Sequence, residues 1–457
     1  EVARVAVHGM VDGAEALVAE AEVPPGGWAS FDLAPRSSGA ALERRAWRIR
    51  SDLPVVAYQI NPSGDPGGVR SNDASLLLPQ RSLGDAYVVT TADALYGAEG
   101  DPGASWGAFV AVVGTTDEPV DVTVEMTSDF EAVRDASVTA RSRTVTARLV
   151  SHEVLWLSSS PGEEGGAGDG NLSGASVRST APVAVFGGNA ATLIPHEGAG
   201  LDPCCAAHVE EQFPPVSSWG RSFVGAGALA RHPSAPEGDT WRVTAGPAGA
   251  SLSWRPSRPA GAPAELAPYA SQRFSTGAGF ALESDSPVQL MHFLKSSGHV
   301  GDPSPRDACD PQTDRGGGYC SITAGFMAAC DHRVTEEGAP GFQCVPVGDP
   351  AMTLFPPTER WRSDYVFLSP SGYAIDFVVV IGARSASPRI DGARLADEDW
   401  EEIASGSPSQ PALGRWVVMV DDGPHELWAE EAVGALVFGY DRRMSYGFPA
   451  GRGASTR

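Results

Sequence analysis

Residues 49–58 read Ile-Arg-Ser-Asp-Leu-Pro-Val-Val-Ala-Tyr, and this phrase recurs along the chain. It returns as Val-Arg-Ser-Thr-Ala-Pro-Val-Ala-Val-Phe at 177–186 and as Leu-Glu-Ser-Asp-Ser-Pro-Val-Gln-Leu-Met at 282–291, with a weaker echo at 428–440. Each copy predicts a short strand, a polar turn closed by proline and a second apolar strand. Recurrence of one such unit indicates a tandem array.

A second phrase, in which proline precedes an aromatic strand, recurs in the same order. An aromatic residue stands eight positions after the proline in each copy: Tyr87 after Pro79, Phe223 after Pro215 and Tyr365 after Pro357. The prolines are separated by 215 − 79 = 136 and 357 − 215 = 142 residues. The order of elements is therefore kept while the loop lengths vary.

The composition favours an all-β fold. The 53 glycines and 37 prolines punctuate short apolar runs, and residues 120–126 (Val-Asp-Val-Thr-Val-Glu-Met) alternate as one face of a strand does. At most, single helical turns are expected at 206–212 and 322–329. We expect tandem β-sandwich-like modules, with a β-propeller of four-stranded blades as the alternative.

Each module is expected to run in one order, from the proline–aromatic phrase to the closing phrase. Between them we expect a hairpin of 109–113 with 120–126 and two strands at 144–150 and 154–157. The expected modules are the closing half of a first module (1–62), a second module (63–200), a third module (201–300), a Cys-rich insertion loop (301–350) and a fourth module (351–457). The opening half of the first module is expected upstream or on another segment.

The charge and hydropathy exclude two classes of partner. A formal charge of −24 disfavours binding to nucleic acid or to an anionic membrane, since both attract cationic patches. No apolar run approaches the roughly 20 residues that span a bilayer, so membrane insertion is not expected.

The cysteines indicate an oxidising compartment. None shows Cys-x-x-Cys spacing, and an even number gathered in loops is typical of disulfides. We expect at least two disulfides, mostly within 309–344, although the sequence leaves the pairing open. The candidates are Cys204, Cys205, Cys309, Cys320, Cys330 and Cys344.

Catalytic motifs are weak. Ser105 lies in a Gly-x-Ser-x-Gly match at 103–107, but a nucleophile elbow requires a strand before it and a helix after it. His152, His196 and His425 each precede a glutamate without the second histidine of a zinc-protease helix. We interpret His152 and His425 as a repeated structural position. The expected protein is not an enzyme.

Metal candidates are equally weak. His208, Glu210 and Glu211 lie near Cys204 and Cys205, yet thiolate ligands would require reduced cysteines. The acidic stretches 302–314 and 421–423 lack the spacing of a calcium loop. No metal and no cofactor is expected.

The residues around the proline phrase have a structural interpretation. Asp73 and Asp349 are expected to cap turns by accepting backbone hydrogen bonds. Trp219 and Trp361 each follow a proline by four residues, and Leu83 takes that place in the first copy. An aliphatic residue at this position favours a role in the core over ligand recognition.

The two phrases together resemble the IgGFc-binding protein N-terminal domain family. The residues that carry the resemblance are 51–58, 71–79, 181–188, 208–215 with Trp219-Gly220, and 348–357. Similar sequences occur in bacterial secreted and surface proteins. The resemblance implies an extracellular, β-rich, non-enzymatic binding or scaffold module and supplies no catalytic residues.

We therefore expect an extracellular or cell-surface binding or adhesion protein whose ligand is another protein or a glycan. The alternative is a structural subunit of a surface fibre or assembly, because a half-module leaves strand edges that another chain could pair. Recognition is expected in the loops at 61–70, 189–207 and 296–348, which follow equivalent strands.

Overall fold

The computed structural model shows an all-β chain, as the sequence predicts. It describes residues 1–33, 40–61, 71–98, 101–133, 135, 137–160, 170–194, 206–231, 238–297, 319–323, 326–334, 340–406, 411–441 and 444–451. The helical segments among these residues are short 3-10 turns.

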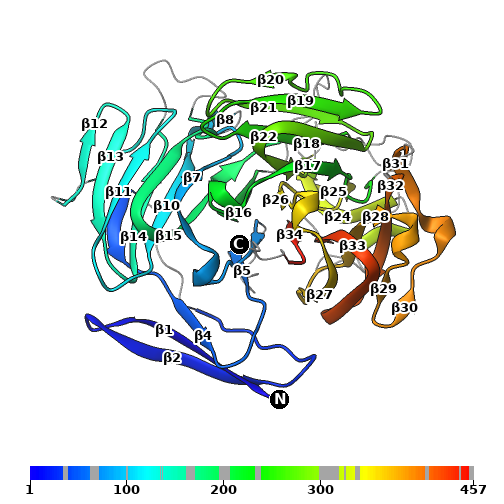
Figure 1. Cartoon of the computed structure of the whole chain (residues 1–457), viewed down its shortest axis with the longest axis horizontal. Helices are drawn as coiled ribbons and strands as arrows, with labels where there is room; N and C mark the ends of the chain where they lie inside the picture. The colour runs from blue at the N-terminus through cyan, green and yellow to red at the C-terminus, as the bar shows by residue number, and fades with distance from the viewer. Residues whose placement is uncertain are drawn as a thin grey trace.

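Antiparallel sheets surround a group of four short central strands (Figure 1). These are β6 (Asp73–Leu76), β16 (Ala207–Phe213), β26 (Met352–Phe355) and β34 (Met444–Pro449). β6 and β26 each contact both β16 and β34, so the four strands close a ring. Four units follow one another around it, which we number as the first (1–61), second (73–192), third (207–293) and fourth (352–441) unit.

A long strand closes each of the last three units and contains the repeated phrase. These strands are β15 (Ser176–Thr192), β22 (Phe280–Phe293) and β33 (Gly423–Asp441). The predicted polar turn is therefore wrong in these units, because the chain continues as one strand through the proline or its equivalent, Ala432. The weaker echo at 428–440 lies within β33, which confirms it as a copy.

The phrase forms a large bulge in the closing strand. Opposite it run β7 (Gly84–Val88), β17 (Gly220–Gly225) and β27 (Arg362–Ser369). From Gly84 to Ala86, β7 advances 86 − 84 = 2 residues while β15 advances 183 − 178 = 5. The same step of five occurs in β22 (288 − 283) and β33 (433 − 428). A bulge bends its strand, so each closing strand can pass from one sheet into another.

The polar residues of the phrase hold this bulge. The Ser179 and Ser284 hydroxyls donate to carbonyl oxygens two residues ahead, at 2.7 and 2.6 Å. In the first three copies of the phrase, the residue that follows the serine accepts, through its side chain, a hydrogen bond from the main-chain N–H of a neighbouring strand. The pairs are Asp52 with Arg4 (2.8 Å), Thr180 with Asp121 (3.0 Å) and Asp285 with Ser251 (2.9 Å). The repeated sequence is thus explained by backbone groups that the bulge would otherwise leave unpaired.

Two curled sheets share the closing strand in each complete unit. In the second unit, β11 (Val120–Glu125) pairs with the first half of β15, and β10 (Ala108–Gly114) pairs with the second half. The predicted hairpin of 109–113 with 120–126 is therefore wrong, because β10 and β11 lie end to end along β15. The outer strands β13 (Thr144–Leu149) and β14 (Glu153–Ser158) extend the two sheets, near their predicted positions.

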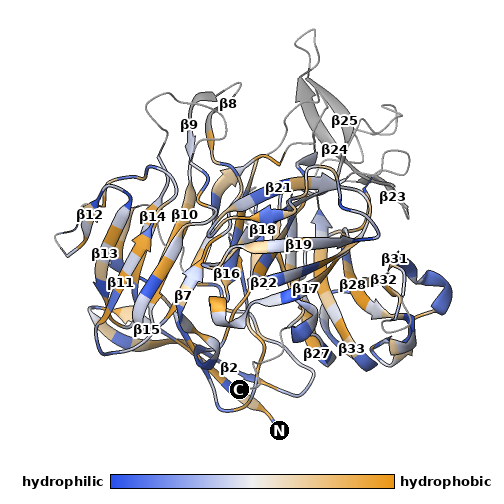
Figure 2. Ribbon diagram, turned by 45° about the horizontal axis from the view of Figure 1, so that its top comes forward, coloured by the Kyte–Doolittle hydropathy of each residue, from blue (hydrophilic) through white to orange (hydrophobic). Residues whose placement is uncertain are grey.

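The sheets enclose apolar cores, which is the sandwich-like arrangement expected from the sequence. Val122, Val145 and Val177 from one sheet meet Val112 and Leu155 from the other in the core of the second unit. Valines 120, 122 and 124 are buried and their neighbours are not, as the alternation predicts. Figure 2 shows the apolar residues running along β10, β15 and β28 (Ile375–Ala383). Within the described residues, no four-stranded blades of a propeller are seen.

The proline phrase leads into a 3-10 turn in every complete unit: η1 (Gln80–Ser82), η2 (Val216–Ser218) and η5 (Thr358–Arg360). Leu83, Trp219 and Trp361 end these turns. Trp219 is buried and Trp361 packs against the core shared by the third and fourth units, which confirms their expected structural role.

The remaining elements complete the units. The first unit contains β1 (Ala3–Val11), β2 (Ala14–Val23), β3 (Ala41–Arg44), β4 (Arg48–Ser51) and β5 (Tyr58–Asn61). The second adds β8 (Leu95–Ala98), β9 (Asp101–Trp106) and β12 (Thr139–Arg141), and the third adds β18 (Asp239–Ala245), β19 (Ala250–Arg255), β20 (Glu265–Leu266) and β21 (Ser271–Thr276). The fourth adds β29 (Arg389–Ile390), β30 (Ala393–Arg394), β31 (Glu401–Ala404), β32 (Leu413–Val420), η6 (Arg384–Ala386) and η7 (Asp397–Asp399).

Two segments expected as helical turns or loop are strands. Residues 206–212 fall largely in β16, and 322–329 fall in β23 (Tyr319–Thr323) and β24 (Phe326–Val334). With β25 (Pro340–Pro346), these strands form a three-stranded sheet inside the stretch expected as an insertion loop. Of the residues that the structure describes, none belongs to a helix long and apolar enough to cross a membrane.

Candidate functional site

The strongest polar cluster lies where the central strands meet. Asp73 on β6 is fully buried, and its Oδ2 accepts hydrogen bonds from the main-chain N–H of Glu210 on β16 (3.1 Å) and of Met352 on β26 (2.8 Å). Its Oδ1 accepts from the N–H of Ala74 at 2.9 Å. One carboxylate therefore joins three strands that form no ladder with one another.

Ser75 on β6 and Glu211 on β16 connect the same three strands two residues further along β6 and β26. The Ser75 hydroxyl donates to Glu211 Oε2 (3.2 Å) and accepts from the N–H of Gln212 (2.7 Å). Glu211 Oε1 accepts from the N–H of Leu354 at 2.8 Å. Asp73 and Glu211 thus accept backbone hydrogen bonds, as was expected of Asp73, but across strands and not within a turn.

Burial dominates the electrostatics of this centre. Loss of hydration raises the pKa of Asp73 well above its usual range, although the N–H groups of Met352, Ala74 and Glu210 favour the ionised form. The nearby Glu211 raises the pKa further. The hydrogen bonds of these carboxyl groups join the central strands, so the centre stabilises the ring of strands.

The predicted metal candidates do not converge. Glu210 accepts hydrogen bonds from Gln59 Nε2 at 3.0 and 3.1 Å, and His208 stacks on Phe109 with ring centroids 6.0 Å apart. His208 Nε2 lies 3.5 Å from Glu210 Oε2. Cys204, Cys205 and Asp202 lie outside the described residues. Within the part of the chain that is described, no group of three or more histidine, cysteine, aspartate or glutamate side chains could hold a metal ion.

The catalytic candidates are separated and structural. Ser105 is exposed on strand β9, without the helix of a nucleophile elbow after it. His152 Nδ1 lies 2.9 Å from the Ala46 carbonyl oxygen, and His425 Nδ1 lies 2.7 Å from Asp391 Oδ2. The idea of a repeated position is wrong, because His152 precedes β14 whereas His425 lies on the closing strand β33. His196 and the stretch 302–314 lie outside the described residues.

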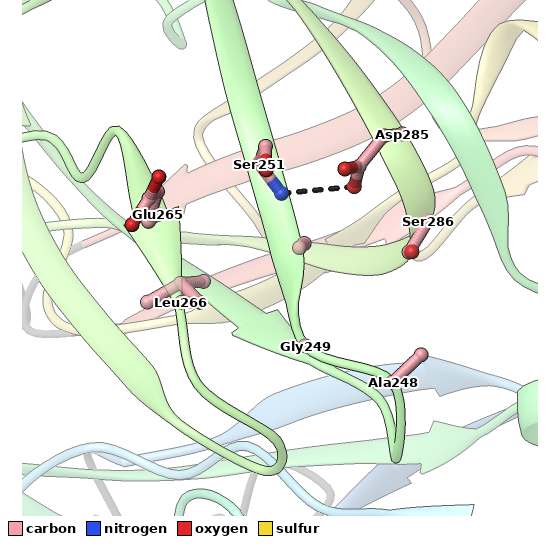
Figure 3. Close-up of a pocket in the computed structure, with 8 residues that line it drawn as sticks. Ala248, Gly249, Ser251, Glu265, Leu266, Asp285 and Ser286 are labelled. Atoms are coloured by element: carbon pink, nitrogen blue, oxygen red, sulfur yellow. Dashed lines mark hydrogen bonds between the residues drawn. The ribbon is translucent and has the colours of Figure 1, made fainter.

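A surface hollow of about 300 Å³ lies beside the bulge of the third unit (Figure 3). Small residues at 248–251 line it together with Glu265, Leu266, Asp285 and Ser286. Asp285 already accepts the Ser251 N–H, and this hydrogen bond lowers the pKa of its carboxyl group. The hollow is therefore a by-product of the bulge and lacks the apolar lining of a ligand pocket.

The central strands β6, β16 and β26 all begin at one end of the molecule, which we call the loop end. Asp73 bonds Glu210 and Ser75 bonds Gln212, so β6 and β16 advance in the same direction. Asp73 accepts the N–H of Met352, and Glu211 accepts the N–H of Leu354, two residues further along β26. β26 therefore runs in the same direction as β6 and β16. The residues directly before these strands, 71–72, 206 and 351, therefore lie at the same end. The loops in which recognition is expected fall largely outside the described residues, so that expectation stays a prediction.

An exposed tryptophan on β9 joins the loop end. The N–H of Ala190, near the end of β15, donates to the Gly107 carbonyl oxygen at 3.0 Å, so β9 ends beside the segment that follows β15. Trp106 is 37% exposed there. Trp106 was not predicted as a site residue, unlike its neighbour Ser105. The only sequence signal for Trp106 is an isolated aromatic residue in a Gly-rich stretch.

A charged cluster that sequence reasoning missed joins the second and third units. Asp93 accepts hydrogen bonds from Arg242 Nη2 at 3.2 Å, Arg273 Nη1 at 2.9 Å and Asn171 Nδ2 at 2.6 Å. Arg242 and Arg273 are opposite each other on β18 and β21, but Asp93 comes from a loop 149 residues before Arg242. No local pattern in the sequence signals such a contact.

The side chains of the six cysteines lie outside what the structure describes. The backbone of β24 and β25 is described, and its register places Cys330 directly opposite Cys344. Cys320 lies on β23, whereas Cys204, Cys205 and Cys309 fall outside the described residues. The expected disulfides remain a prediction.

Comparison with known proteins gives one informative match. The family described as IgGFc binding protein matches residues 73–313 and 323–439, which cover the second and third units and the fourth unit up to residue 439. No curated protein matches the chain. A solved structure, a putative membrane anchored protein from Corynebacterium diphtheriae, aligns over 100% of this chain and 97% of its own at 8% identity, with a TM-score of 0.09. That likeness carries no argument.

Proposed function

Because the chain belongs to the IgGFc-binding protein family, we propose that it is an extracellular, non-enzymatic protein that binds another protein or a glycan through its loop end. The observation that carries this proposal is the family match across three consecutive units. A bacterial cell surface and a role in adhesion are the setting we propose for it.

The distribution of polar groups supports a scaffold that presents loops. The buried carboxyl groups of Asp73 and Glu211 hold the central strands together. The serines and aspartates of the repeated phrase stabilise the bulge that recurs in the units. The residues directly before β6, β16 and β26 lie at one end of the ring, and the exposed ring of Trp106 lies near the same end. Loops on a rigid β scaffold are where binding residues commonly lie.

The test compares loop-end variants on named probes. The chain, a version with residues 310–343 replaced by a short Gly-Ser linker, and Trp106→Ala are applied to immobilised Fc fragment of immunoglobulin G and to a glycan array. We expect binding to at least one probe that the replacement abolishes and Trp106→Ala weakens. Trp428→Ala is the matched control, because Trp428 is 49% exposed on the bulged half of β33.

Two results would contradict this function. Unchanged binding after the replacement would move recognition away from the loop end. Hydrolase turnover that is lost in Ser105→Ala would show that the protein is an enzyme. The control is circular dichroism of the variant in which 310–343 is replaced, which should show the same β signal as the full chain. Loss of this signal would show that residues 310–343 belong to the core.

A second candidate function, a subunit of a surface assembly, is favoured by one observation. The first unit leaves large apolar side chains exposed, among them Leu17, Ile49 and Val55. An uncovered apolar sheet edge is a site for strand addition. Light scattering at several protein concentrations tests this candidate, and a monomer at all of them would count against it.

A further inference from the structure

The first unit lacks, within the described residues, a strand that every other unit has. β15 pairs along one edge with β7, β22 with β17 and β33 with β27. β4 and the segment after it carry the same phrase, and β4 pairs with β1 as β15 pairs with β11. In the described chain, the opposite edge of β4 has no partner, since its sheet runs in the order β2-β1-β4.

The side chains at this edge are exposed only in the first unit. Five residues before the proline, Ile49 is 39% exposed, whereas its equivalents Val177, Leu282 and Leu427 are 0–1% exposed. One residue after the proline, Val55 is 42% exposed, whereas Val183, Val288 and Val433 are 0–1% exposed. Single exposed apolar residues are common, but these two positions belong to the core of every other unit.

The neighbouring proline is uncovered in the same way. Pro215 and Pro357 are buried, and an added Cβ on the glycine that faces each would lie 2.6 Å from Pro215 or 2.2 Å from Pro357. These glycines are Gly84 on β7 and Gly220 on β17. Pro79 is exposed. The strand that would cover Ile49 and Val55 is therefore also the strand that would cover Pro79.

We propose that Ile49, Val55 and Pro79 form an acceptor groove for an extended β-strand of the type of β7, bound in trans as a peptide segment of another polypeptide. The inference goes beyond the proposed function, because the groove lies on the bulged half of the units and not at the loop end. Strand addition to an exposed edge combines main-chain hydrogen bonds with pockets for alternate side chains.

The pairing in the second and third units, whose strands β7 and β17 each also face the proline of the next unit, specifies the chemistry of the occupant. A glycine must oppose Val55, because only a residue without Cβ fits against Pro79, as Gly84 fits against Pro215. Three residues later comes an aromatic ring, as Tyr87 follows Gly84, opposite the position of Ile49. A tyrosine there also donates its hydroxyl hydrogen to the bulge carbonyl, as Tyr87 does to Val183 at 2.6 Å.

The test uses a fluorescent peptide that copies residues 83–91, with fluorescence anisotropy as the readout. We expect saturable binding to the full chain and new hydrogen-exchange protection at residues 48–57. Ile49→Glu should weaken binding by about tenfold or more, the loss expected when burial of one large apolar side chain is forfeited. Met419→Glu on β32 is the control, since Met419 is 54% exposed and should leave binding unchanged.

A second peptide, with Gly84→Val, makes the proposal specific. It should bind at least tenfold more weakly because its side chain would collide with Pro79. Equal binding of the two peptides, or none, overturns the proposal. Concentration-dependent dimers of the chain that Ile49→Glu dissolves would also overturn it, by assigning the groove to a second copy. Replacement of 310–343 should not affect peptide binding, so the proposed groove and the proposed binding at the loop end are tested independently.

Discussion

Asp73 and Met352 are 279 residues apart in the chain, yet Asp73 Oδ2 accepts the main-chain N–H of Met352 at 2.8 Å. The same oxygen accepts the N–H of Glu210. Parallel strands usually satisfy these groups by a ladder, whereas here a buried carboxylate takes the place of the missing rungs. The centre of the ring therefore depends on side chains that cannot be exchanged for apolar ones of similar size.

Asp73→Asn should destabilise the chain. The amide that replaces the carboxyl can direct its oxygen to either side, but its NH2 group then faces a backbone N–H. One buried donor without an acceptor costs about 1–3 kcal/mol. Guanidinium unfolding should show a lower midpoint, whereas Asp121→Asn on the exposed face of β11 should not change it. An unchanged midpoint in Asp73→Asn would show that the carboxylate bridge contributes little.

Stability should fall as the pH rises from about 4 to 7. Burial raises the pKa of Asp376 to about 7 from the ordinary value of 3.8, with Asp422 adding to the shift. In that window the folded chain holds a proton that the unfolded chain has released, so the free energy of unfolding decreases with pH.

The variant for this prediction is Asp376→Asn, which keeps an acceptor for the Tyr446 hydroxyl. Its unfolding midpoint should change less between pH 5 and pH 8 than that of the parent chain. The exposed Asp364→Asn should keep the parent's dependence. A parent chain that is more stable at pH 8 than at pH 5 would show that other groups dominate.

A tyrosine hydroxyl supports the bulge in two units and is absent from the third unit. Tyr365 OH donates to the Val433 carbonyl oxygen (2.5 Å) and accepts from the N–H of Arg362 (2.9 Å). Phe223 occupies the equivalent place in β17. Tyr365→Phe should cost about 1 kcal/mol for each hydrogen bond lost. Phe223→Tyr should cost nothing or stabilise the chain, and a large loss in thermal unfolding would argue against equivalence of the three bulges.

Cys330 and Cys344 should form a disulfide. Directly opposed residues of antiparallel strands have Cα atoms about 4.5–5.5 Å apart, which suits a disulfide, and these two residues are register partners. Peptide mapping by mass spectrometry without reduction should recover the linked pair. Six free thiols would contradict both this pairing and the extracellular location.

The sequence by itself determined the local structure of this protein. Alternating apolar residues, glycines and prolines predict short strands correctly, because the period of side chains in a strand is a local property. The two repeated phrases likewise predict the succession of units and the family, whereas the 3-10 turns after the proline phrase were not predicted. Tyr87 and Tyr365 stand where the repeat places them because each unit folds the same phrase in the same way.

Only the tertiary structure decided which strands pair and what the polar residues do. The local sequence predicts a turn at the repeated phrase and a hairpin of 109–113 with 120–126, because proline favours the turn and a short loop favours the hairpin. The chain instead continues through a bulge, because the closing strand must serve two sheets at once. Whether Ile49 is core or surface likewise depends on a strand that no neighbouring residue encodes.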